Sequence, residues 1–351
     1  MATFTPFVED RDVLGGQKEI VTAPLWSDAQ ASLIRIFTSS YQSSNQKRYY
    51  YEVYNSASAD ANAEPQFSVA YGDTKGSGSD RGTGNIDDLP TRSIYGQYRQ
   101  LLLDAGTNLF TFSNGETSEY VYIININRAR FKDKVDTDNW QLSIGKLNST
   151  TTSASITTGN DVFTLIDDSG ASTIEYTQQG GRVYNIRSGS IANGINTSDT
   201  TPWGLFYPDN GIIVLNGKAL DASASFGTKR TPSTASINQN NAFRVFTSIS
   251  GAIAFNTSSF AFQGRTSEVV SSLYYYVRLY NGEYNYSTNP TFLTGSTSGV
   301  KYQSMFIDPS VYVTSIGLYD DNQELLAVAK LSKPIQKTFE KEIVVKVKID
   351  W

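Results

Sequence analysis

The sequence predicts a mainly β protein, built from antiparallel sandwich-like or barrel-like modules with two short helices. Short runs rich in Tyr, Ile and Val recur along the chain, separated by Gly, Asn and Asp, as is typical of strands joined by turns. Several runs also alternate between apolar and polar residues, which favours strands with one buried face. The expected strands cover residues 48–54, 119–127, 211–216, 272–280, 311–318 and 340–350.

The expected strand at 340–350 shows this alternation most clearly, because its branched apolar residues fall on one face and its charged residues on the other. The apolar positions are Ile343, Val345, Val347 and Ile349, and the charged positions are Lys346, Lys348 and Asp350. We expect such a strand to add to the sheet of another subunit as readily as to its own.

A β-hairpin is expected just before it, within residues 311–331. The acidic segment 320–322 supplies the turn, since Asp and Asn favour turn conformations. Val328 and Leu331 are expected to face a core, and Pro334 is expected to end the hairpin.

Two segments are expected to be helical. Ser27 and Gln30 have the spacing of a capping box, which marks a helix start, and the second segment begins after Pro90 and ends before Gly106. The apolar residues at helical spacing are Leu33, Ile34 and Phe37 in the first segment and Ile94, Tyr95, Tyr98, Leu101 and Leu102 in the second. Both segments are too short to form an independent bundle.

The sequence indicates three parts: an N-terminal arm with a short helix at 1–40, a β-rich domain at 41–265 and a C-terminal β domain at 266–351. Three polar segments of the middle domain are expected to be exposed loops, because they are too rich in Gly, Ser, Thr and Asp to pack a core. These loops are residues 72–88, 148–160 and 227–241.

Histidine and cysteine are both absent from the 351 residues. Without cysteine there are no disulfides, thiolate metal ligands or cysteine nucleophiles. Without histidine the chain lacks the commonest general base and metal ligand, which excludes Ser-His-Asp, Cys-His and His-containing zinc chemistries. The sequence therefore predicts no enzyme activity, no catalytic residue, no cofactor and no metal, and only carboxylate, Lys, Tyr or Arg chemistry stays open.

The formal net charge of -5 lacks the strongly basic field that non-specific phosphate binding needs, so nucleic acid is not an expected partner. The N-terminal residues show no basic segment followed by an apolar run, and no stretch approaches the roughly 20 apolar residues that span a bilayer. We therefore expect neither a membrane partner nor a secretory signal.

Two patterns that can mark active sites have simpler interpretations here. The Gly-rich run at 72–84 matches neither GxxxxGK[ST] nor GxGxxG, and we interpret it as a flexible or interface loop. The acid pairs at 87–88, 167–168 and 320–321 are adjacent, whereas a glycosidase holds two carboxylates about 5 to 10 Å apart on different elements. We interpret these pairs as solvated turns and keep a carboxylate-only hydrolase as an alternative.

Tyrosines gather in two clusters, at 49–54 and 274–280. The flat apolar face and polar tip of Tyr suit protein interfaces and stacking on sugars alike. We interpret the clusters as core and protein interface, with sugar binding as the alternative. The interface candidates are Tyr274, Tyr276, Tyr280, Tyr284 and Tyr286, together with Gly76, Asp80 and Arg81 from the loop at 72–88, which is expected to act as a reaching arm.

Three consecutive segments resemble a module of virion structural proteins from contractile-tailed, T-even-like phages, especially those of cyanobacteria. They are GEYNYSTNPTF at 282–292, DPSVYVTSIGL at 308–318 and LYDDNQELLAVAKLSKP at 318–334. The phrase VTSIGLYDDNQELLAVAKL within them is also similar to segments of phage tail-collar and tail-fibre proteins. Residues 122–134, 180–190 and 203–221 are similar to further parts of the same virion proteins. The resemblance spans roughly half of the chain and brings no assigned catalytic residue.

The resemblance implies a structural subunit of a phage virion, assembled in the host cytoplasm with copies of itself and other virion proteins. It implies a place in the tail or baseplate region. Two alternatives stay open: a carbohydrate- or receptor-binding tail-fibre module that contacts a host surface glycan, and a capsid or neck accessory protein.

Overall fold

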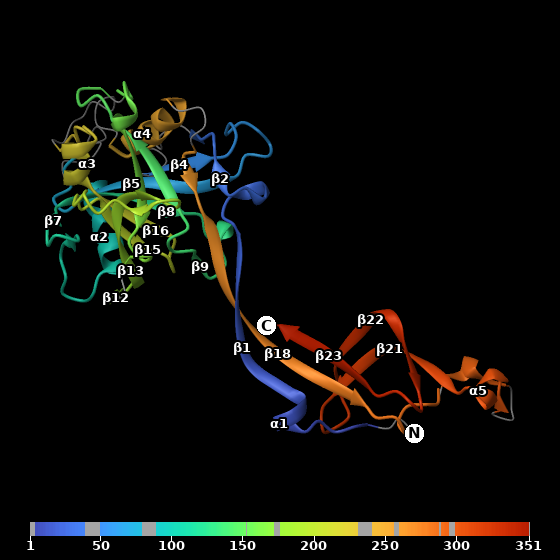
Figure 1. Cartoon of the computed structure of the whole chain (residues 1–351). Coiled ribbons are helices and arrows are strands. Elements are labelled where there is room, and N and C mark those ends of the chain that lie inside the picture. The colour runs from blue at the N-terminus through green and yellow to red at the C-terminus, as the bar shows by residue number, and fades with distance from the viewer. Residues whose placement is uncertain are drawn as a thin grey trace. The chain divides into compact units, whose positions relative to one another are not determined.

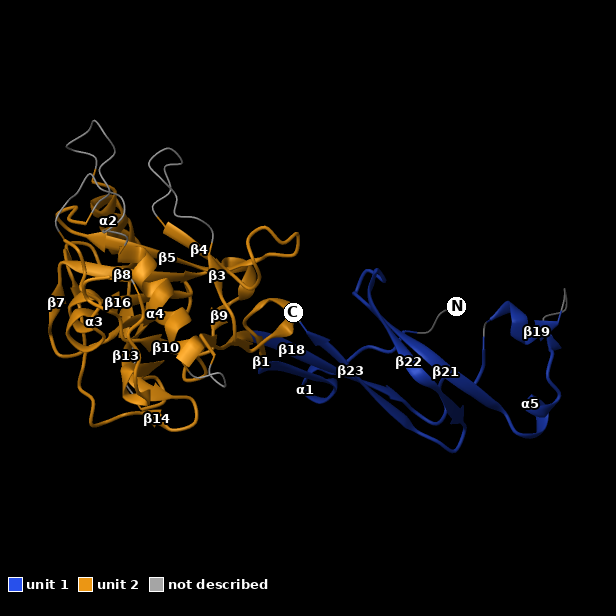
Figure 2. Ribbon diagram, turned by 90° about the horizontal axis from the view of Figure 1, so that it is seen from above, with its two compact units in different colours: residues 1–20, 269–351 blue, residues 21–268 orange. Residues whose placement is uncertain are grey.

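The computed structural model describes residues 4–38, 50–78, 89–151, 153–171, 176–230, 241–255, 260–287, 289–294 and 299–350. Within these ranges the protein is mainly β, with antiparallel sheets and short helices, which confirms the predicted fold class (Figure 1). The chain consists of two compact units: unit 1 comprises residues 1–20 and 269–351, and unit 2 comprises residues 21–268 (Figure 2).

Unit 2 is organised by a curled antiparallel sheet of 13 strands. Its main path in space is β2 (Ser32–Leu33), β17 (Phe262–Gln263), β10 (Gln141–Gly145), β11 (Val162–Asp167), β13 (Gly181–Ser190), β15 (Gly204–Tyr207), β16 (Ile212–Asn216), β8 (Tyr120–Ile126), β5 (Pro65–Asp73), β4 (Tyr50–Tyr54) and β3 (Phe37–Thr38). The short strands β12 (Tyr176–Gln178) and β14 (Gly194–Ile195) pair with opposite ends of β13.

The strand β8 explains why this sheet forms. Its sequence YVYIINI is almost entirely β-branched or aromatic, and its side chains alternate between two hydrophobic cores. Tyr122 and Ile124 lie in the first core, whereas Val121 and Ile123 lie in the second. The sheet is therefore buried on both faces, which is why its strands carry little polar alternation.

Helices contribute side chains to both cores. The helix α2 (Pro90–Leu102) packs on β5 and contributes Tyr95 and Leu102 to the second core. It confirms the helix predicted after Pro90, and Gly106 follows it with a positive φ of 90°. The helix α4 (Asn241–Phe255) packs on β10 and contributes to the first core. None of the helices in the described ranges is long and apolar enough to cross a membrane.

The helices α3 (Gly217–Ser223) and α4 are absent from the prediction. In α3 the side chain of Asn216 caps the first turn by accepting from the backbone N–H of Lys218 at 3.1 Å. In α4 the buried residues Ala242, Val245, Ile249 and Ala252 have helical spacing. The same segment is rich in Ser, Thr, Gly and branched residues, which disfavour helices in isolation, so packing on the sheet decides its structure.

The helix predicted from Ser27 is wrong. Residues 27–29 make a single 3₁₀ turn, η1 (Ser27–Ala29), in which Asp28 and Ala29 have positive φ of 59° and 55°. The Ser27 hydroxyl accepts a hydrogen bond from the Gln66 side chain at 2.9 Å instead of capping a helix. The chain continues as β2 and β3, so strand pairing overrides the local capping signal.

The polar segments differ in how exposed they are. Gly72, Asp73, Gly76 and Gly78 are buried, and β5 extends to Asp73, so the exposed loop predicted from residue 72 is wrong for these residues, whereas Lys75 is exposed. Residues 79–88 and 231–240 lie outside the described residues. The segment at 148–160 is mostly exposed where it is described, and it leads into η3 (Gly159–Asp161).

Short elements complete the two units. In unit 2 they are the pair β6 (Phe110–Thr111) and β7 (Thr117–Ser118), the turn η2 (Arg128–Arg130) and β9 (Lys134–Val135), which pairs with the start of β18. In unit 1 they are α1 (Glu9–Asp12), η4 (Pro290–Phe292), the pair β19 (Leu293–Thr294) and β20 (Gly299–Val300), and α5 (Ser304–Ile307).

Unit 1 contains a small β-sandwich. One layer is the sheet β1 (Val13–Pro24), β18 (Arg265–Leu279) and β23 (Ile343–Asp350), in that order, as far as these strands lie in unit 1. The other layer is the hairpin of β21 (Ser310–Tyr319) and β22 (Leu325–Thr338). A core between the layers is built on Ile316, Leu318, Val345 and Val347. Residues 1–20 thus share a unit with the C-terminal strands.

The predicted hairpin is present, with its turn at 320–322, but two details differ. Val328 is 62% exposed, while Ala327, Ala329 and Leu331 pack on the core, so the prediction that Val328 faces the core is wrong. Pro334 does not end the hairpin either. A register shift between Val313 and Ser315 places the proline in a bulge, where its missing N–H costs no ladder hydrogen bond, and β22 continues to Thr338.

Candidate interaction surface

All five tyrosines predicted as interface residues lie in unit 1. Tyr274 and Tyr276 are half-buried and point to the same face of β18, since they are two residues apart on a strand. Tyr280, Tyr284 and Tyr286 lie on the loop after β18 and are exposed. The structure thus divides them into a strand group and a loop group.

Tyr274 belongs to a charged network on the outer face of its sheet. Its hydroxyl donates to Glu19 on β1 at 2.8 Å, and the ammonium of Lys346 lies 3.8 Å from its ring centroid. Lys348 bridges Glu19 at 2.8 Å and Asp350 at 3.2 Å, and the bond from Lys348 lowers the pKa of Glu19. Because Lys346 already covers its ring, Tyr274 connects the strands of its own sheet.

The loop tyrosines are held by a buried lysine. The Nζ of Lys337, on β22, donates to the backbone oxygens of Asn281 and Thr338 at 3.0 and 2.9 Å and to Oδ1 of Asn285 at 2.9 Å. Tyr284 has a positive φ of 52°, and its hydroxyl lies 2.7 Å from Oγ1 of Thr5. The loop therefore has a fixed conformation that presents its tyrosines at the surface.

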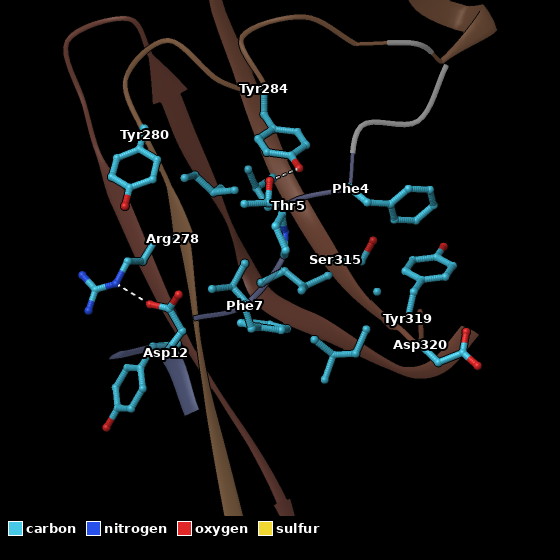
Figure 3. Close-up of a pocket in the computed structure, with 18 of the residues that line it drawn as sticks. Phe4, Thr5, Phe7, Asp12, Arg278, Tyr280, Tyr284, Ser315, Tyr319 and Asp320 are labelled. Atoms are coloured by element: carbon cyan, nitrogen blue, oxygen red, sulfur yellow. Dashed lines mark hydrogen bonds and ion pairs between the residues drawn. The ribbon is translucent and has the colours of Figure 1, made fainter. Parts of the chain in front are cut away.

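A pocket of about 640 Å³ lies next to this loop (Figure 3). Figure 3 shows Phe4 beside Tyr319, and the two rings meet edge to face with centroids 4.9 Å apart. Phe7 contributes a second aromatic wall, with its ring centroid 5.2 Å from that of Tyr275. The lining is mainly aromatic and aliphatic, so this pocket suits apolar side chains.

Asp12 and Arg278 pair in the charged part of the pocket lining, which also includes Arg11. Asp12 is buried, and its carboxylate accepts hydrogen bonds from Arg11 at 2.8 and 2.9 Å, Arg278 at 2.9 Å and the backbone N–H of Val8 at 3.1 Å. Mainly because of Arg11, the pKa of Asp12 lies far below its usual range. Such a carboxylate is a fixed structural anion, unsuited to take up a proton in catalysis.

An apolar surface lies on the outside of the hairpin, and we call it the outer hairpin face. It consists of Tyr319, Leu325, Leu326 and Val328, with Leu326 69% and Val328 62% exposed. Gly317 leaves room for the ring of Tyr319 on this face, because a Cβ at position 317 would lie 2.8 Å from that ring. Sequence reasoning missed this face, although the small residues Ala327 and Ala329 between the larger ones indicate which side packs inward.

Sheet edges add to the surface of unit 1. The strand β23 pairs with β18 on one side and with no described strand on the other. The hairpin is a two-stranded sheet, so each of its strands likewise has one edge without a strand partner in the described ranges. Unpaired edge groups are a template for strand addition from another chain.

Known proteins offer no relative with which this surface could be compared. No family model, curated protein or solved structure matches the chain. The interpretation of the surface therefore depends on its own residues.

Of the three candidates from the loop at 72–88, the structure describes Gly76 alone. Gly76 is buried with a positive φ of 75°, and a Cβ there would lie 2.5 Å from Cβ of Leu89, so Gly76 has no surface to offer a partner. Asp80 and Arg81 lie outside the described residues.

The described acid pairs are hydrogen-bonded within the fold, and the interpretation of the pair at 167–168 as a solvated turn is wrong for the buried Asp167. Asp167 is buried, which raises its pKa, and accepts from the backbone N–H of Asp138 at 2.9 Å. Asp168 accepts from Asn185 at 2.9 Å, and Asp320 accepts from the backbone N–H of Glu324 at 2.7 Å in the hairpin turn. Residues 87–88 lie outside the described ranges. Within those ranges no group of three or more acidic side chains is placed to hold a metal ion.

Proposed function

We propose that this protein is a structural subunit of a phage virion, in the tail or baseplate region, and that it acts through contacts with copies of itself and other virion proteins rather than as an enzyme. The observation that supports this proposal is the outer hairpin face. Tyr319 pairs with Leu325 across the hairpin, and Leu326 and Val328 follow on the same strand as Leu325, all four exposed on a unit whose own core is small.

The physical reason is the free energy of leaving such a face in water. Burying apolar surface contributes roughly 25 cal/mol per Å², and contiguous exposed apolar patches are typical of protein interfaces. The tyrosines at 280, 284 and 286 add amphipathic side chains, which interfaces favour. A neighbouring subunit that covers the outer hairpin face and pairs with a sheet edge would complete the surface of unit 1.

The virion assignment is tested on particles purified from the host that carries this gene. We expect peptides of the chain at levels comparable to known structural proteins by quantitative mass spectrometry, and antibody label at the tail in electron micrographs. A chain that is expressed but missing from tailed particles would refute the proposal, and label on the capsid or neck would refute the tail or baseplate position.

The interface is tested with a variant supplied in trans during infection. Leu326→Lys combined with Val328→Lys places two charges on the outer hairpin face without touching the core, so the purified chain should fold normally. We expect the variant to be depleted from particles at least tenfold. The matched control is Tyr176→Lys, a change of an exposed aromatic residue in unit 2. Equal incorporation of the variant and the control would argue against this interface.

A further inference from the structure

A second hollow, of about 530 Å³, lies in unit 2 beside α2. Its floor is a cross-strand row, because Glu52 on β4 pairs with Ser68 on β5, and Ser68 pairs with Asn125 on β8. The next row on the same face runs through Ala70 to Ile123, which lies in the second core. A carboxylate, a hydroxyl and an amide are thus aligned where an otherwise apolar sheet face ends.

The polar groups of this floor are largely free to bind a ligand. In the described part of the chain the Ser68 hydroxyl has no hydrogen-bond partner, and the carboxylate of Glu52 accepts only from the Tyr54 hydroxyl, at 2.5 Å. The side chain of Asn125 faces the hydroxyl of Tyr98, where it partly offsets the rise in the Tyr98 pKa that burial causes. Polar groups so placed are costly to desolvate unless something replaces their water.

Two tyrosines and a glutamine form the walls. Tyr50 on β4 and Tyr98 on α2 are half-buried, and Gln97 on α2 is exposed. Their neighbour Tyr51 points to the opposite face and is buried in the first core, as alternation on a strand requires. Ser68 and Ala70 are small, which leaves the hollow between the larger side chains empty.

We propose that this groove binds a neutral saccharide. A sugar presents apolar C–H faces, which stack on tyrosine rings, and rows of hydroxyls, which bond to carboxylate and amide groups in alternation. An acidic sugar fits less well, because Glu52 lies on the floor and the cation in the lining, Arg128, lies 4.6 Å from the ring of Phe131. This binding function is separate from the structural role proposed above and does not rest on it.

The test uses the full chain and four probes: maltotriose, cellotriose, chitotriose and mannotriose. We expect saturation-transfer NMR and titration calorimetry to detect at least one of them, with a dissociation constant on the order of 0.1–5 mM. Ser68→Leu should fill the hollow, and Tyr50→Ala should remove a stacking wall, so each should weaken binding at least tenfold. Binding of none of the probes at roughly 20 mM would overturn the proposal.

Two further measurements show whether the saccharide binds in this groove. Tyr176→Ala removes an exposed tyrosine elsewhere in unit 2 and should bind like the unchanged protein. If Ser68→Leu fails to fold, the test uses Tyr50→Ala and Gln97→Ala, a change on the surface of α2. Circular dichroism then checks that both variants are folded. Unchanged affinity in these variants, or an equal loss in Tyr176→Ala, would place the saccharide elsewhere and overturn the proposal.

Discussion

The ammonium group of Lys337 lies 2.9 Å from the side-chain oxygen of Asn285, and both residues are buried. With the backbone oxygens of Asn281 and Thr338 it has three acceptors, one for each N–H of the ammonium group. Full pairing is what makes a buried lysine tolerable. This contact ties the loop that carries Tyr284 to β22.

Lys337→Met tests that contact. Methionine fills a similar volume, but the oxygen of Asn285 loses its donor, so we expect the free energy of unfolding to fall by about 1–3 kcal/mol. Hydrogen exchange should rise in the loop at 281–286 more than in the sheet. The matched control is Lys333→Met, an exposed lysine on the same strand, which should change neither quantity. An equal effect of both substitutions would contradict the contact.

The lowered pKa of Asp12 predicts that unit 1 is less stable in acid. This pKa is lowered on folding, mainly by Arg11, so the contribution of Asp12 to stability is present above the ordinary carboxyl pKa and is lost as pH falls toward the folded value. We expect the melting temperature to fall below about pH 4. Asp12→Asn should melt earlier at pH 7 and show a flatter decline in acid. Asp10→Asn, at an exposed neighbouring acid, should keep the acid decline of the unchanged protein.

Much of the fold follows from the sequence. Each of the six predicted strands overlaps an observed one, namely β4, β8, β16, β18, β21 or β23, because β-branched and aromatic residues fit a pleated buried surface whatever their partners. The helix after Pro90 follows from apolar spacing and a fixed φ at its first residue. The failures at Ser27 and in α4 concern segments whose structure depends on distant strands such as β5 and β10.

The candidate surface was predictable only in part. The tyrosine cluster indicated β18 and its loop, where the tyrosines are exposed or half-buried. The sequence does not show that Lys346 covers Tyr274 or that Lys337 anchors the loop, because each contact joins segments more than 50 residues apart. The outer hairpin face depends on register. A shift of one residue exchanges the two faces of a strand, and the bulge near Val313 makes that register hard to infer.

Lysine substitutions in β22 test the assignment of its faces. Val328→Lys puts a charge on the exposed side and should leave the free energy of unfolding within about 0.5 kcal/mol of the original. Ala329→Lys puts the same charge against the core of unit 1 and should cost about 2–4 kcal/mol. Urea unfolding monitored by fluorescence measures both. The reverse order would mean that the strand faces are exchanged.

Burial of β8 on both faces gives the last prediction. Ile123 and Ile124 are adjacent, fully buried and in different cores, so truncation of either leaves a cavity on its own side of the sheet. We expect Ile123→Ala and Ile124→Ala each to lower the free energy of unfolding by about 2–5 kcal/mol. In β23, where one face is exposed, Val344→Ala should cost less than about 0.5 kcal/mol, while Val345→Ala should cost more than that. If only one of the two isoleucines proved costly in urea unfolding, the sheet would have a single core, and the polar row from Glu52 to Asn125 would lie on an ordinary wet face.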